Sequence, residues 1–277
     1  MKSITLSNGM EMPALGFGTF QTGGAECENS VKLAVAEGYR LIDTAQAYGN
    51  EEYVGRALAS CGVPRDQLFL TTKVNFPSYD AAQEVVEASL RKLQTDYIDL
   101  MLLHWPFGNY YAAWRVLEKC LEQGKIRAIG ISNFDPDRMV DLIQFNKVAP
   151  AVNQIEMNLL CQRKAERRWM EKYNGAAMAY APLGQGKKNE MFENPALREI
   201  AAAHEKTPAQ IALGFLVQSG AVVIPKSTHE NRIRENAALF DFTLSAAEME
   251  QLAAMDTASP MVGTAENPET VEIAMTW

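Results

Sequence analysis

Four polar residues in this sequence, Asp43, Tyr48, Lys73 and His104, are of the types that transfer a proton to a carbonyl group. A free tyrosine titrates near ~10, and a neighbouring ammonium group lowers the pKa of its phenol. A lysine in apolar surroundings needs a counterion, which a carboxylate supplies. We therefore expect Asp43 to hold Lys73, Lys73 to lower the pKa of Tyr48, and Tyr48 to donate a proton to a substrate oxygen. His104 would hydrogen-bond the same oxygen and orient it.

Protonation of a carbonyl oxygen makes its carbon electrophilic, so the reaction also needs a hydride donor. No side chain supplies hydride, whereas a nicotinamide cofactor does. The stretch AVVIPKSTHENRIREN offers a place for the cofactor's phosphates, because Lys226 and Ser227 end an apolar run just before a helix that carries Arg232. Arginine can grip a phosphate through two hydrogen bonds, which lysine cannot do. Tyr180 could stack on an aromatic ring, and the loop 183–186 lets backbone approach a pyrophosphate.

Short apolar runs alternate along the chain with stretches of helical period. The runs lie at 14–19, 41–45, 68–74, 98–104, 126–133, 151–157, 176–183 and 221–227. Their continuous hydrophobicity is typical of parallel strands buried on both faces. Eight strand–helix units predict an α/β fold, a (β/α)8 TIM barrel that forms a single domain over residues 1–277, with an N-terminal β-hairpin turning at Ser7-Asn8-Gly9. A doubly wound sheet would favour GxGxxG after its first strand, and GFGTFQ lacks the third glycine.

Polar residues stand at or near the ends of successive runs, where TIM barrels place their chemistry. Taken alone, each has a plainer interpretation: Asp43 as a loop cap, Lys73 as a solvated strand end, His104 as a structural histidine, Arg232 as an exposed helix residue and Tyr180 as a core residue. If these residues lie at the same end of successive strands, they would instead line one mouth of the barrel. Their positions then no longer look independent of one another.

Composition limits the possible partners. The net charge is −8, which argues against nucleic acid as the main partner. The N-terminus has no apolar signal core and no run reaches ~18 apolar residues, so we expect a cytoplasmic protein without a membrane span. The four cysteines are far apart, with no CxxC and no histidine at metal-ligand spacing. We therefore expect reduced thiols and no metal.

The ordered motifs resemble the aldo-keto reductase family over most of the chain. They are GFGTFQ, GYRLIDTAQAYGNEEYVGRAL, TTKV, LLHWP, GKIRAIGISNF, VNQIE, APLGQG and IPKSTHENRIREN. The resemblance implies a (β/α)8 barrel enzyme that reduces aldehyde or ketone carbonyls to alcohols with NADPH. It also implies that Asp43, Tyr48, Lys73 and His104 are catalytic, with Tyr48 as the general acid.

The resemblance further implies a set of cofactor-binding residues: Gly18, Thr19, Asp43, Ser132, Asn133, Gln154, Tyr180, Leu183, Gly184, Lys226, Ser227, Arg232, Glu235 and Asn236. Within this set Ser132, Asn133 and Gln154 would contact the nicotinamide carboxamide. Lys226 and Arg232 imply a 2′-phosphate, hence NADPH over NADH. The implied substrate pocket comprises Phe20, Tyr48, Phe76, His104 and Trp105, with Trp277 as a further candidate; core packing is the alternative for these aromatic residues.

Some positions depart from the usual family pattern. Phe20 stands where tryptophan is common, and Asn75 stands where many members have tryptophan two residues after the catalytic lysine. The compact loops resemble bacterial members close to diketo-gluconate reductases. A cofactor-binding regulatory subunit of the same fold is the alternative function. A metal-dependent barrel hydrolase is disfavoured, because only His104 lies at a strand end. We expect a monomer acting on a small-molecule carbonyl substrate.

Overall fold

A parallel sheet of eight strands forms the centre of the computed structural model, which describes residues 2–186, 188–262, 264–274 and 276. Each strand pairs with the next one along the chain. The strands are β3 (Gly16–Gly18), β4 (Leu41–Asp43), β5 (Phe69–Val74), β6 (Ile98–Leu103), β7 (Ile126–Ser132), β8 (Val152–Glu156), β9 (Ala176–Tyr180) and β10 (Val222–Val223). A parallel bridge between Leu15 and Val223 joins the two edges. The sheet therefore closes into the predicted (β/α)8 barrel.

The last strand is much shorter than the predicted run 221–227. Pro225 follows closely, and proline has no N–H to donate to a sheet ladder. Beyond the strand, the Pro225 carbonyl accepts from Gly18 N at 3.1 Å. Lys226 and Ser227 consequently lie on the loop after β10 and not at the end of a strand.

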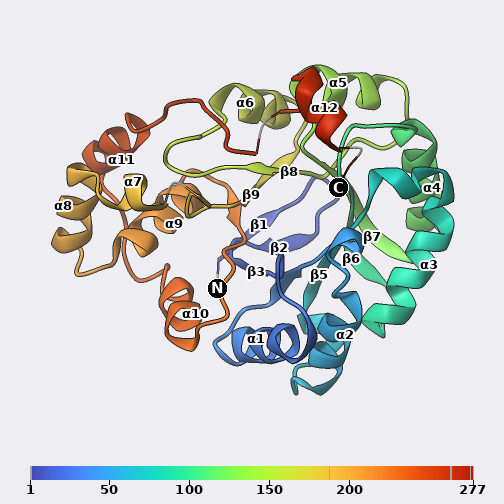
Figure 1. The fold of residues 1–277 in the computed structure, drawn as a ribbon, viewed down its shortest axis with the longest axis horizontal. Coiled ribbons are helices and arrows are strands. Elements are labelled where there is room, and N and C mark those ends of the chain that lie inside the picture. Colours follow the sequence, from blue (N-terminus) through green and yellow to red (C-terminus); the bar gives the residue numbers. More distant parts are fainter. Residues whose placement is uncertain (1, 187, 263, 275, 277) are drawn as a thin grey trace.

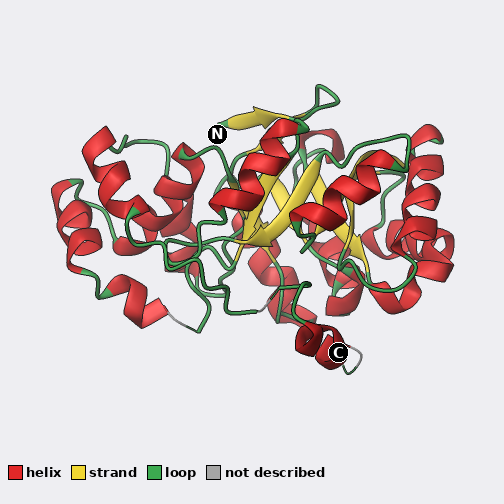
Figure 2. Cartoon of the chain, turned by 90° about the horizontal axis from the view of Figure 1, so that it is seen from above, coloured by secondary structure: helices red, strands yellow, loops and turns green. Residues whose placement is uncertain are grey.

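The predicted N-terminal hairpin covers one end of the barrel. Its strands β1 (Ser3–Thr5) and β2 (Glu11–Pro13) pair in antiparallel register around a turn with Gly9 at φ 83°. Leu6 and Met12 belong to the same buried cluster as residues from the starts of the barrel strands. Figure 2 shows this hairpin at the end of the barrel opposite the C-terminus.

Helices surround the sheet, as Figures 1 and 2 show. They are α1 (Gly24–Ala36), α2 (Glu51–Ser60), α3 (Ala82–Leu93), α4 (Tyr110–Glu122), α5 (Pro136–Gln144), α6 (Lys164–Lys172), α7 (Lys188–Phe192), α8 (Pro195–Ala203), α9 (Pro208–Gln218), α10 (Glu230–Ala237), α11 (Ala246–Ala253) and α12 (Pro268–Ala274). Pro208 begins α9, where Thr207 and Gln210 form a capping box. None of the described helices combines the length and the hydrophobicity needed to cross a lipid bilayer.

The sequence did not predict α7 and α12. Both helices are shorter than two full turns, which is too short for a repeating pattern of apolar residues to be recognised in the sequence. The segment from 259 onward therefore contains a helix that the sequence pattern does not reveal.

Candidate active site

Asp43 and Lys73 form a buried ion pair at the C-terminal ends of neighbouring strands. Lys73 Nζ lies 2.7 Å from Asp43 Oδ1, and the two side chains are 0% and 2% exposed. Lys73 Nζ also donates to the Thr44 carbonyl at 2.9 Å and lies 3.4 Å from the Tyr48 hydroxyl. The three residues thus meet as the sequence predicts, because adjacent parallel strands end at the same edge of the sheet.

The loop that carries Tyr48 is fixed by polar side chains within the stretch LIDTAQAYGN. Tyr48 ends a short 3₁₀ helix, Gln46–Tyr48, that Gly49 terminates at φ 65°. Asn50 accepts from Thr44 Oγ1 at 2.6 Å and donates to the carbonyls of Thr19 and Thr22. This buried amide ties the loop to the segment after β3 and so holds the phenol in place.

The phenol does not have the lowered pKa that the sequence led us to expect. Removal from water and the Asp43 carboxylate raise the pKa of Tyr48 well above its usual range. Lys73 cannot reverse this, because Asp43 pairs with it directly and burial lowers the pKa of its ammonium group. Burial likewise raises the pKa of Asp43. Tyr48 is therefore fully protonated at neutral pH.

His104 follows β6 and lies beside Tyr48, with ring centroids 5.8 Å apart. Its backbone is held from both sides: its N–H donates to the Val74 carbonyl, and its carbonyl accepts from Asn133 Nδ2. Burial and the Lys73 charge lower the pKa of His104 to about 3. The imidazole is thus neutral at physiological pH and can serve as a hydrogen-bond donor through one ring nitrogen.

Polar side chains on or just after β7, β8 and β9 form a linked network near Asp43. Gln154 Nε2 donates to Asp43 Oδ2 at 2.7 Å, so the carboxylate is held by one partner on each oxygen. Ser132 Oγ donates to the Gln154 carbonyl, and the Tyr180 hydroxyl donates to Asn133 Oδ1 at 2.8 Å. Asn133 adopts φ 61°, a left-handed conformation that asparagine tolerates.

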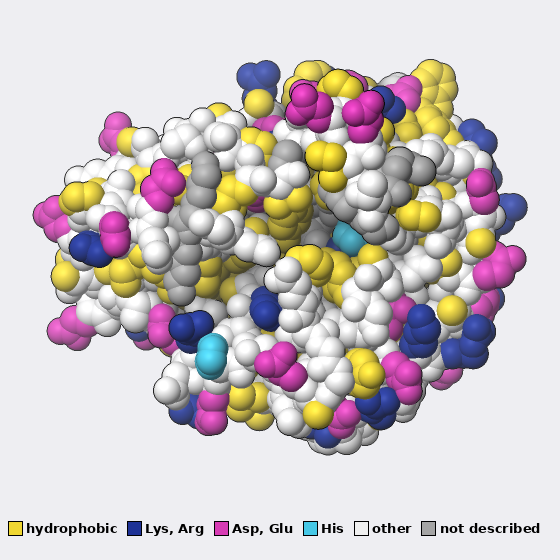
Figure 3. All heavy atoms as spheres, in the orientation of Figure 1, with side chains coloured by type: hydrophobic (Ala, Val, Ile, Leu, Met, Phe, Trp, Pro, Cys, Tyr) yellow, Lys and Arg dark blue, Asp and Glu magenta, His cyan; other side chains and the backbone are white. Residues whose placement is uncertain are grey.

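A cavity of about 520 Å³ opens over these groups. The face seen in Figure 3 is hollowed near its centre, with hydrophobic side chains around the hollow. Lining residues include Phe20, whose ring lies 4.9 Å from that of Tyr48, and Trp105, whose backbone is fixed by the Tyr79 hydroxyl. Phe76 is not among the lining residues and packs edge-on against Phe107 instead.

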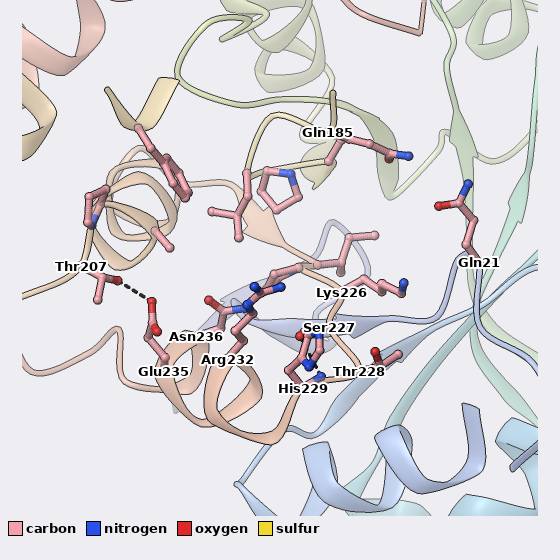
Figure 4. A pocket seen from close by; sticks show the side chains of 18 of the residues that line it. Gln21, Gln185, Thr207, Lys226, Ser227, Thr228, His229, Arg232, Glu235 and Asn236 are labelled. Carbon is pink, nitrogen blue, oxygen red and sulfur yellow. Dashed lines mark hydrogen bonds between the residues drawn. The ribbon is translucent and has the colours of Figure 1, made fainter. Parts of the chain in front are cut away.

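A second cavity of about 640 Å³ adjoins the first, since Ala181 and Ile224 line both. Figure 4 shows Lys226, Ser227 and Arg232 around it. Further residues in its wall are Leu183, Gln185, Gln21, Thr207, Glu235 and Asn236. Thr207 Oγ1 donates to Glu235 Oε1 at 2.6 Å and fixes that carboxylate.

The helix α10 carries two arginines with different surroundings. Arg234 pairs with Glu37 and with Glu230. Arg232 lines the second cavity, and among the described residues it makes no ion pair. Of these two arginines, Arg232 is therefore the one positioned to meet a ligand's negative charge.

The two adjoining cavities offer different groups to a ligand that spans both. The cavity at the barrel mouth offers the amide and hydroxyl groups of Ser132, Asn133 and Gln154, and the second cavity offers the cations that phosphates require. At Gly18 a Cβ atom would stand 2.9 Å from the Ile224 carbonyl oxygen, so only glycine fits in this wall. Among the described residues no cluster of His, Cys, Asp or Glu could hold a metal ion.

Several lining residues escaped the sequence reasoning. Ala181 lies in both walls at φ 47°, Ala47 and Val262 line the first cavity, and Gln21 lines the second. Small apolar and lone amide side chains give no chemical signal in a sequence; of these residues, Ala181 alone had a further indication, its position directly after a strand. Conversely, Thr19 and Gly184 lie outside both walls, and Trp277 lies outside the described residues.

Comparison with known proteins identifies the family. The sequence model of the Aldo/keto reductase family matches residues 14–257. The chain belongs to the aldo-keto reductase family. This aldo-keto reductase is 43% identical over 256 residues to the methylglyoxal reductase DkgA of Yersinia pestis, covering 91% of this chain and 92% of that protein.

Two other similar proteins extend the comparison. The chain is 42% identical over 258 residues to a glyoxal reductase of Bacillus subtilis, covering 92% of each protein. Its fold matches the crystal structure of MGS-M4, an aldo-keto reductase from a Medee basin deep-sea metagenome library, with a TM-score of 0.93 and 38% identity. That match covers 96% of this chain and 99% of the other. The protein is accordingly an oxidoreductase of this family.

Proposed function

We propose that this aldo-keto reductase uses NADPH to reduce aldehyde and ketone carbonyls to alcohols, with Tyr48 as the proton donor. The observation that carries the proposal is the Asp43–Lys73 pair, whose ammonium group lies 3.4 Å from the Tyr48 hydroxyl at the base of a cavity. A phenol beside a fixed cation is suited to give its proton to an oxygen that gains negative charge.

The proposed cofactor-binding roles are those that the family resemblance implies, and the lining of the two cavities is compatible with them. Ser132, Asn133 and Gln154 would bind the nicotinamide carboxamide, and Tyr180 would stack on the ring. Lys226 and Arg232 would hold the phosphates at the adenosine end, with the 2′-phosphate as the group that selects NADPH. When bound, the dinucleotide supplies hydride to the carbonyl carbon.

The side chains then have separate tasks. Tyr48 keeps its proton until the substrate oxygen becomes basic, because its pKa is raised. Lys73 stabilises the phenolate that results, and Asp43 holds Lys73 in place through the 2.7 Å contact. Neutral His104 donates a hydrogen bond to the same substrate oxygen and orients the carbonyl.

The lining of the first cavity supports neutral substrates. Its described wall contains aromatic, aliphatic, hydroxyl and amide side chains and the Asp43 carboxylate, but no Lys or Arg. A substrate carboxylate would lose water there without gaining a cationic partner, which is costly. We therefore expect neutral aldehydes, ketones and dicarbonyls, a class that includes the compounds in the names of the two bacterial relatives.

The test is a substrate panel followed at the NADPH absorbance band, with the wild-type protein and Tyr48→Phe. We expect turnover of neutral carbonyls by the wild type and a loss of at least ~10²-fold in the variant, with NADPH binding retained by fluorescence. Turnover of the variant within about tenfold of wild type would remove Tyr48 as the acid. NADPH binding without turnover of any carbonyl would favour the alternative, a regulatory subunit. A monomeric state and a cytoplasmic location stay predictions from the sequence.

A further inference from the structure

Glu156, the last residue of β8, is a carboxylate buried at the barrel mouth. Glu156 is 3% exposed, and among the described residues its side chain forms no ion pair with Lys or Arg. Its oxygens instead accept the backbone N–H of Met261, at 3.0 and 2.9 Å, and that of Val262, at 3.0 Å. Asn158 Nδ2 adds a weaker contact at 3.4 Å. The charge is thus satisfied mainly by a segment 105 residues further along the chain.

Because of these hydrogen bonds, the position of the backbone at residues 261 and 262 depends on one side chain, that of Glu156. A buried carboxylate without donors is costly, whereas hydrogen bonds from backbone N–H groups to an ionised oxygen are strong. Glu156 therefore favours the conformation in which residues 261 and 262 lie at the mouth. Two contacts fix the segment on either side: Thr257 donates to the Leu160 carbonyl, and Glu266 N donates to Asp135 Oδ2 at 3.2 Å.

The held segment supplies a wall of the substrate cavity. Val262 lines the first cavity together with Phe20 and Trp105 and is 41% exposed. It is the lining residue furthest along the described chain, and it comes from outside the barrel strands and their loops. Its place in the wall depends on backbone contacts that converge on Glu156.

We propose that Glu156 is a positioning residue that seats Val262 against the substrate cavity and thereby limits the size of carbonyl compound that the enzyme accepts. This inference rests on the proposed function for its kinetic consequence. Glu156 itself does not line the cavity, so it acts through Val262 and not by touching the substrate. The Val262 side chain sets the boundary, and the Glu156 carboxylate keeps that boundary in place.

The kinetic test compares Glu156→Gln, Val262→Ala and the double variant on a small aldehyde, propanal, and a bulky one, 4-isopropylbenzaldehyde. Either single change should raise kcat/KM for the bulky aldehyde relative to the small one by about tenfold, mainly through KM. The double variant should gain no more than the better single variant, because both changes remove the same wall. Glu269→Gln, an exposed residue on α12, is the matched control and should change nothing.

An unchanged selectivity in Glu156→Gln would overturn the proposal, as would a double variant whose gain equals the product of the single gains. Glu156→Asp keeps the charge but withdraws its oxygens by one methylene, and it should fall between wild type and Glu156→Gln. It also provides the test if the glutamine variant fails to fold.

Hydrogen exchange gives a readout that does not need activity. Without substrate or cofactor, the amides of Met261 and Val262 should exchange about tenfold faster or more in Glu156→Gln than in wild type or Glu269→Gln. Faster exchange in a protein without any reductase activity would refute the proposed function and keep the role of Glu156 in holding the segment. Unchanged exchange in an active enzyme would refute the role of Glu156 alone.

Discussion

The two adjoining cavities differ in how their charged groups are placed: those of the first are buried and paired, and the cations of the second are exposed to solvent. At the barrel mouth the ion pair of Lys73 and Asp43 is almost fully buried, on strand ends and with hydrogen bonds on both carboxylate oxygens. In the second cavity Lys226 and Arg232 are exposed, on a loop and on a helix. Groups that would do the chemistry are fixed before a ligand arrives, whereas groups that would hold a phosphate remain in water until it does.

This difference has an energetic side. A buried charge that loses its partner cannot recover solvation, so the first cavity tolerates few changes. An exposed cation that is removed leaves no orphaned charge, so the second cavity should affect ligand affinity and barely affect stability. The following experiments separate the two behaviours, beginning with the largest expected effect.

Lys73→Met should reduce both activity and stability. It leaves Asp43 charged and buried without its cation, and breaking such a pair costs roughly 3–5 kcal/mol of unfolding free energy. Denaturant unfolding of Lys73→Met, Asp43→Asn and the double variant measures this. The double variant should be more stable than Lys73→Met, because no charge is then left unpaired; a strictly additive loss would mean that the pair is not coupled.

Arg232→Ala should leave unfolding unchanged and weaken NADPH binding by about tenfold to a hundredfold, since a charge-assisted contact to phosphate contributes roughly 1.5–3 kcal/mol. NADH binding should change much less. Arg234→Ala is the matched control, because that arginine is engaged by Glu37 and Glu230. Fluorescence titrations with both dinucleotides decide the matter, and an equal loss of NADPH and NADH affinity would contradict selection through the 2′-phosphate.

The pH profile tests whether the first cavity keeps its groups neutral. The pKa of His104 is lowered to about 3 and the pKa of Tyr48 is raised, so neither group titrates between pH 6 and 9. We expect kcat/KM for reduction to be flat across this range. A limb near pH ~6.5, the ordinary histidine value, that disappears in His104→Gln would show that the imidazole gains and loses its proton in this range, contrary to the expectation.

A smaller effect is expected at Asp135, which lies beside the mouth. Burial raises the pKa of this carboxyl to about 6, although Arg163 opposes the shift. Since the folded state binds the proton more tightly than the unfolded one, this group's contribution to stability is present below pH ~4 and is lost as pH rises through about 6. We therefore expect wild type to lose unfolding free energy relative to Asp135→Asn when the pH is raised from 4.5 to 7. Denaturant unfolding of both proteins at the two pH values measures this.

The sequence predicted the parts of the molecule that depend on local pattern. The strands that lead to Asp43, Lys73 and His104 were found from continuous apolar runs, and the meeting of these residues followed from parallel topology. The pKa of Tyr48 could not be predicted, because it depends on how much water the fold removes and on the exact distance between Asp43 and Lys73. The role of Val262 was equally hidden, because its contact with Glu156 joins residues more than a hundred positions apart.

The hairpin β1–β2 has a practical consequence. It lies at the end of the barrel away from the C-terminus, and Leu6 and Met12 pack it onto the strand starts. Coupling the protein to a bead or electrode through this end would direct the entrance toward bulk solution. A linker attached after α12 would instead crowd the entrance, so the choice of attachment site should set the output of an immobilised catalyst.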